Sequence, residues 1–224
     1  MKKIFTLSLF LLNLAAIDGF SQNFKVQLPP GYNKILMADE IPGKEGSPYL
    51  FEEWLPGTIL LKNGSQIEGL KYRYCVYKKE MHYQFENTTY AIGKPDSIKE
   101  LHMGNKTFVY LNFRKESNSE MDFFEVVLDG KAKLLIRHIA EIIPSNYNVA
   151  LSVGSKNDRI VMKETYYLQK DKEEPVFIDK KGKSIQLAFS DKTKEVSEFI
   201  KKEKIVFKEK DSLVSLIKYY NSIN

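Results

Sequence analysis

The chain has 224 residues, with 34 Lys or Arg, 29 Asp or Glu and a formal net charge of +5. Hydrophobic residues make up 43% of the sequence and charged residues 28%, values that exclude a disordered or collagen-like chain. A charge of +5 is too small for the dense basic face that nucleic-acid binding requires, so no nucleic-acid partner is expected.

The N-terminus has the pattern of an export signal. Two lysines precede an apolar run over 4–14, and the small residues Gly19 and Ser21 are placed for cleavage before Gln22. We therefore expect residues 1–21 to be removed as a signal peptide. The mature protein is then expected in the periplasm or associated with the outer membrane. No later stretch is long and apolar enough to predict a transmembrane helix.

Residues 22–57 are rich in proline and glycine, which predicts an extended lead-in segment without a helix or a central strand. The segment also contains Tyr49, Phe51 and Trp54. Because these large aromatic side chains gain from burial, we expect the lead-in to lie against the main domain over 58–224.

Residues 58–178 predict a series of antiparallel strands. Asn63-Gly64 indicates a hairpin with a type I′ turn, and Asp129-Gly130 has the same chemistry. Short connections favour pairing between strands that follow each other in the chain. The runs that predict strands are 58–62, 65–68, 70–77, 81–86, 88–92, 97–103, 106–114, 121–128, 131–143, 160–168 and 175–178.

The polar stretch 144–158 predicts a long loop, and the hydrophobic period then changes to that of helices within 183–224. Ser190 or Asp191 is the expected N-cap of one helix, and Asp211 or Ser212 that of the last. The predicted fold is therefore α+β, with a curved antiparallel β-meander of roughly eight to ten strands forming a partly open barrel. Two or three short C-terminal helices cover one side of it.

The sequence gives little sign of catalysis. His82, His102 and His138 are far apart, and no pairing typical of zinc ligands occurs among them. Adjacent carboxylates stand in turns or extended segments, where they stay hydrated, and no P-loop or nucleophile elbow is present. We therefore assign no catalytic, cofactor-binding or metal-binding residue. The third hypothesis is a hydrolase whose active site is assembled by the fold from residues far apart in the sequence, with His82 or His102 taking part.

Other single residues have ordinary and functional interpretations. Cys75 has no second cysteine to pair with, and its aromatic strand context favours burial over pairing with another molecule. Ser97 and Ser212 stand in Asp-Ser-aliphatic triplets that match a bacterial O-glycosylation sequon. The alternative is ordinary turn or helix-cap chemistry, and for Ser212 the cap is the favoured interpretation.

Several spaced segments recur in a fixed order along the chain. They are the signal peptide ending at Ser21-Gln22, the Tyr-rich strand after Leu70, and residues 57–64, 123–130, 165–168, 198–202 and 219–221. Together they resemble a group of secreted proteins of Bacteroidota-type bacteria. The resemblance implies export and a single-domain architecture, and it transfers no active site.

The leading hypothesis is a non-enzymatic cell-envelope protein that binds or scaffolds another envelope protein through its sheet or the 144–158 loop. The alternative is a carrier of an apolar small molecule inside a half-barrel closed by the helices. Candidate lining residues for that carrier are Phe108, Tyr110, Phe123 and Val127.

Overall fold

The structure is a computed structural model. It describes residues 33–35, 44–86, 88–115, 118–148 and 150–223. The expected signal peptide lies outside the described residues, as does much of the lead-in.

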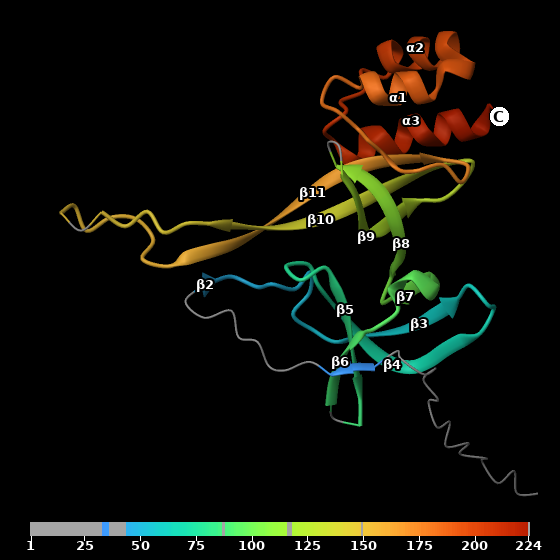
Figure 1. The fold of residues 1–224 in the computed structure, drawn as a ribbon. Coiled ribbons are helices and arrows are strands. Elements are labelled where there is room, and N and C mark those ends of the chain that lie inside the picture. Colours follow the sequence, from blue (N-terminus) through green and yellow to red (C-terminus); the bar gives the residue numbers. More distant parts are fainter. Residues whose placement is uncertain (1–32, 36–43, 87, 116–117, 149, 224) are drawn as a thin grey trace, which may run out of the picture.

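The described chain forms one twelve-stranded open sheet followed by three helices, which confirms the α+β meander (Figure 1). The sheet order is β1-β6-β5-β4-β3-β7-β8-β9-β10-β11-β12, and β2 pairs with β11 in parallel. Three short strands at the margins, β1, β2 and β12, bring the number above the expected range. The strands are β1 (Asn33–Ile35), β2 (Lys44–Glu45), β3 (Leu55–Leu61), β4 (Gln66–Cys75), β5 (Glu80–Phe85), β6 (Thr88–Ile92), β7 (Ile98–Met103), β8 (Lys106–Lys115), β9 (Asn118–Leu128), β10 (Ala132–Ile143), β11 (Asp158–Lys170) and β12 (Val176–Phe177).

A bulge in β4 shifts the alternation of buried and exposed side chains along that strand by one residue. Ile67 is buried, and after Gly69 the buried positions are Leu70, Tyr72 and Tyr74. Gly69 has φ +78°, which a glycine adopts without strain, and the register to β3 shifts beside it. The extra residue keeps both parts of β4 facing the same core.

Strand β3 begins three residues earlier than predicted, at Leu55, so the end of the lead-in belongs to a central strand. Pro56 is tolerated because it is the second residue of the strand, where its missing N–H is least costly. Gly57 is required there, because a Cβ atom would lie 2.1 Å from the carbonyl oxygen of His102.

The predicted type I′ turn at Asn63-Gly64 is wrong. Gly64 has φ +89°, but Asn63 does not have positive φ. The Gly64 N–H donates to the carbonyl of Leu61, and the Leu61 N–H donates to the carbonyl of Ser65. A single left-handed residue therefore closes this hairpin, as in a turn followed by a glycine bulge.

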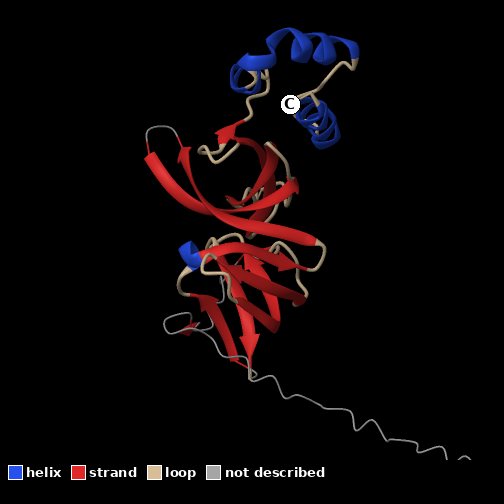
Figure 2. Ribbon diagram, turned by 90° about the vertical axis from the view of Figure 1, so that its right-hand side faces the viewer, coloured by secondary structure: helices blue, strands red, loops and turns tan. Residues whose placement is uncertain are grey.

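Figure 2 shows the sheet as two curved portions, with the helices beyond the upper one. A first core cluster joins β3–β9 and includes Tyr72, Tyr74, Phe108 and Phe123. A second cluster lies between the helices and β10–β11, and a third, around Phe113 and its neighbours, packs on the other face of the upper strands. Different parts of the sheet are thus buried by different elements of the chain: the helices cover β10 and β11, and other strands cover the rest.

The helices are α1 (Lys183–Ala188), α2 (Thr193–Lys202) and α3 (Lys210–Ser222). The expected N-caps are wrong: α2 begins after Lys192 and α3 after Glu209, and neither residue makes a side-chain cap bond. Asp191 instead accepts hydrogen bonds from Lys170 and Tyr220, which ties the segment before α2 to β11 and α3. The Asp191 side chain, which the local sequence pattern predicts as a helix N-cap, is therefore used in tertiary contacts instead.

Candidate functional site

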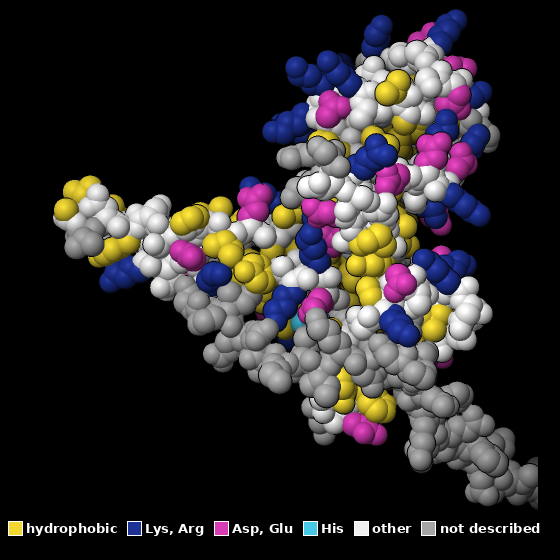
Figure 3. Space-filling model, in the orientation of Figure 1, with side chains coloured by type: hydrophobic (Ala, Val, Ile, Leu, Met, Phe, Trp, Pro, Cys, Tyr) yellow, Lys and Arg dark blue, Asp and Glu magenta, His cyan; other side chains and the backbone are white. Residues whose placement is uncertain are grey.

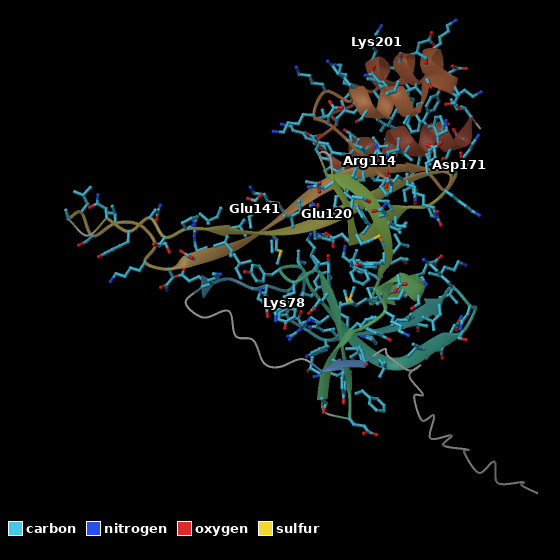
Figure 4. The ribbon with its side chains drawn as sticks, in the orientation of Figure 1. Lys78, Arg114, Glu120, Glu141, Asp171 and Lys201 are labelled. Carbon is cyan, nitrogen blue, oxygen red and sulfur yellow. The ribbon has the colours of Figure 1, made fainter. Side chains whose placement is uncertain are left out.

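A long hairpin projects from the body of the molecule (Figure 1). Strands β10 and β11 pair without interruption from Ala132↔Lys170 to Ile143↔Arg159. We call the outer part, residues 139–163, the arm, and the loop over 144–157 its tip. Figure 4 shows Glu141 on the arm, well separated from the helices that carry Lys201.

The described part of the lead-in braces the root of the tip. Strand β2 pairs in parallel with the first residues of β11, and the Asn157 side-chain amide donates to Glu45 Oε1 at 3.1 Å. Gly46 passes so close to β11 that a Cβ atom would lie 2.7 Å from the carbonyl oxygen of Ile160. Further down the arm, Ala140 and Met162 pack against the first core cluster. The arm is therefore supported along part of its length.

Side chains and one glycine shape the tip. The Ser145 N–H donates to Asp158 Oδ1 at 2.9 Å, and the Ser155 N–H donates to Asn146 Oδ1 at 2.9 Å. Gly154 has φ +98°, and a Cβ atom there would lie 2.5 Å from the carbonyl oxygen of Asn146. These contacts define the path of the loop.

The tip exposes hydrophobic side chains. Leu151 is 69% and Val153 56% exposed, and Figure 3 shows hydrophobic side chains gathered at the end of the arm. Tyr147 lies beside Lys156, whose Nζ is 4.9 Å from the ring centre. Because exposed apolar groups at the end of a supported projection gain nothing from the fold itself, they indicate a contact surface.

The predicted ligand-lining residues separate into two places. Phe108 and Phe123 are fully buried in the first core cluster, where each ring lies edge-on to Tyr74. Tyr110 packs on Phe123 with ring centres 4.8 Å apart. Val127 instead lines a pocket of about 360 Å³.

That pocket combines valines with charged and polar side chains. His102 Nδ1 lies 3.0 Å from Thr107 Oγ1, and His102 Nε2 lies 3.5 Å from Glu100 Oε2. Across the pocket, Lys133 Nζ lies 2.5 Å from Asp129 Oδ1. A row of hydroxyl, imidazole and carboxylate resembles a proton relay, but His102 and Thr107 are paired positions of the β7–β8 hairpin. Their contact follows from the strand register alone.

The structure does not bring the other histidines to this pocket. His82 is on β5, separated from β7 by two strands in the sheet order, and is 2% exposed. Burial lowers its pKa, while Glu80, 3.3 Å from Nε2, partly opposes that effect. His138 is buried on β10.

Two buried charge clusters were not predicted from the sequence. In one of them, Glu125 receives hydrogen bonds from His138, at 2.8 Å, and Lys106. Burial raises the pKa of Glu125, but the two hydrogen-bonded partners outweigh it and lower the pKa below its usual value. In the other, Arg137 pairs with Asp122. Acidic residues in an otherwise apolar strand were the available signal, but their partners are on neighbouring strands.

The remaining predicted residues have local roles. Cys75 is buried as expected, and burial raises the pKa of its thiol. Ser97 ends a 3₁₀ turn and donates to the carbonyl of Lys94 at 2.6 Å. Ser212 is in the first turn of α3 and partly buried.

Within the described part of the chain, no group of three or more His, Cys, Asp and Glu side chains is arranged to hold a metal ion. No described helix combines the length and the apolar character needed to cross a lipid bilayer. Comparisons with known proteins add no relative: no family model, curated protein or solved structure matches the chain significantly.

Proposed function

We propose that the protein is exported to the cell envelope and acts there as a non-enzymatic binding or scaffolding module. Its contact surface is the tip of the β10–β11 arm. The proposal is supported by one observation above all: Leu151 and Val153 are exposed at the end of a hairpin that β2 and the first core cluster brace. A supported projection presents its end to a partner with little loss of conformational freedom on binding.

The test removes the tip and keeps the contacts of β2 with β11 that support it. Residues 146–156 are replaced by Asn-Gly, which leaves Asn157 and the β2 pairing in place. Wild type and variant are crosslinked to envelope components in cells, and the crosslinked species are compared. We expect the main crosslinked species to disappear in the variant while its urea unfolding midpoint is retained. Unchanged crosslinked species contradict the proposal.

A second candidate, the small-molecule carrier, is supported by the pocket that Val127 lines, whose volume of about 360 Å³ is within the range of ligand sites. Its lining of valines and charged side chains fits a small molecule with an apolar body and one polar end. Native mass spectrometry of the protein purified from the periplasm tests this function. A bound small molecule that Val127→Trp removes supports the carrier, and a protein free of ligand contradicts it.

A further inference from the structure

We infer that the tip of the arm enters the interfacial layer of a lipid membrane with an anionic surface. The inference rests on the proposed function, because it names the partner of the same contact surface. The tip residues that carry it are Tyr147, Leu151, Val153 and Lys156.

Part of the backbone of the tip, within its described residues, is hydrogen-bonded inside the loop. The Asn148 N–H donates to the carbonyl of Val153 at 2.8 Å, and the Leu151 N–H donates to Asn148 Oδ1 at 3.1 Å. The Ser155 N–H donates to Asn146. Because unpaired backbone groups are costly to move out of water, a loop with its own hydrogen bonds is suited to enter the boundary between headgroups and acyl chains.

The charge of the tip suits an anionic surface. The segment between Glu141 and Asp158 contains no acidic residue, and Lys156 is the one charged residue in that segment. Asp158 accepts the Ser145 N–H, and exposed Arg159 follows it. The Coulomb interaction of this region with phosphate headgroups is therefore attractive.

Tyr147 and Lys156 form the aromatic and cationic pair that is typical of the headgroup level of membranes. The Lys156 Nζ lies 4.9 Å from the centre of the Tyr147 ring. Amphipathic aromatic rings and lysines concentrate at that depth because each has an apolar body and a polar end. The pair would mark the limit of insertion, with Leu151 and Val153 deeper.

The small size of the tip favours a membrane over a folded protein as its partner. A stable protein interface buries about 800 Å² on each partner, which requires roughly 20 residues a side. The end of a two-stranded hairpin offers far less. A lipid surface surrounds an inserted side chain on all sides, so a few residues and a cation suffice for reversible binding.

The chain offers a matched control for this surface. Leu187 is 75% exposed, slightly more than Leu151, but it is on α1, in the helical layer and well away from the tip (Figure 1). An effect of general surface hydrophobicity would depend on Leu187 as much as on Leu151.

The experiment is flotation of the purified mature protein with vesicles. One vesicle population is phosphatidylcholine alone, and the other contains about one third phosphatidylglycerol. We expect wild type and Leu187→Asp to float with the anionic vesicles. The double variant Leu151→Asp/Val153→Asp is expected to bind at least about tenfold more weakly. Lys156→Glu is expected to weaken binding at low salt and to have a smaller effect at high salt.

Two results overturn the inference: wild type that stays unbound, and binding that the double variant leaves unchanged. Equal binding to both vesicle populations overturns the assignment of an anionic surface. The proposed function fails separately. If the protein does not float but the tip-dependent crosslink to an envelope protein is present, the contact surface stands and its partner is a protein.

Discussion

Arg137 on β10 and Asp122 on β9 form an almost fully buried ion pair, with 2.8 Å between Arg137 Nε and Asp122 Oδ2. The Tyr74 hydroxyl, on β4, donates to the other oxygen of the same carboxylate at 3.1 Å. Asp122 therefore connects the lower portion of the sheet with the strands that continue into the arm. Arg137 also lies over the Phe113 ring, 4.6 Å from its centre.

Removing one partner of this ion pair is expected to destabilise the fold strongly. Asp122→Ala leaves the Arg137 charge buried without its carboxylate, and such changes cost about 3–5 kcal/mol of unfolding free energy. Asp129→Ala breaks an ion pair with Lys133 in which the Asp129 side chain is 68% exposed, and is expected to cost less than about 1 kcal/mol. Urea unfolding of both variants measures the difference. Equal costs would contradict the structural role of Asp122.

A second prediction concerns the close approach of β3 to β7. Gly57→Ala places a methyl group 2.1 Å from the His102 carbonyl oxygen, so the backbones must separate. We expect a cost of at least about 3 kcal/mol, above the usual range for a single change in a well-packed core. Gly64→Ala is the control, because its Cβ meets nothing within 4 Å and only the positive φ of +89° is strained. It is expected to cost about 1 kcal/mol.

The strand succession was predictable because the hydrophobic pattern is local. Most expected strands agree with β3–β11 within a few residues, since turns such as Asn63-Gly64 separate clear runs of β-branched and aromatic residues. The positions of the helix caps were not predictable in the same way. Asp191 has the local features of an N-cap, but Lys170 and Tyr220 compete for its carboxylate, and these partners become neighbours only after folding.

The candidate site was only partly predictable. The sequence indicated a loop over 144–158, but not that the flanking strands project. That geometry depends on β2, whose parallel pairing with Asp158 and Arg159 joins residues more than a hundred positions apart. A local sequence pattern cannot predict a contact between residues so far apart. The burial of Phe108 and Phe123 likewise depends on how the sheet curves.

The burial of His82 predicts a pH dependence of stability. Burial lowers its pKa below the ordinary value of 6.5. As the pH falls below about 6.5, the unfolded chain takes up a proton here that the folded chain takes up only at lower pH. The contribution of uncharged His82 to the unfolding free energy is therefore complete above that pH. It is lost as the pH falls through the lowered pKa of the folded state.

His82→Gln is expected to flatten this part of the curve, measured as urea midpoints between about pH 7 and pH 5. His102→Gln, on the surface of the β7–β8 hairpin, keeps His82 and should keep the wild-type slope. A wild-type slope in the His82 variant would mean that another group causes the dependence.

The exposure of the tip predicts that its hydrophobic residues contribute to binding and not to stability. Leu151→Asp/Val153→Asp is expected to change the unfolding free energy by less than about 0.5 kcal/mol per substitution, as for other exposed positions. Ile160→Asp, on the arm just below the tip, replaces a side chain that is 8% exposed and is expected to cost more than about 3 kcal/mol. Thermal and urea unfolding of the three proteins compare these costs. If the tip variant unfolds as readily as Ile160→Asp, then Leu151 and Val153 stabilise the fold. Their exposure would then carry no argument for a partner.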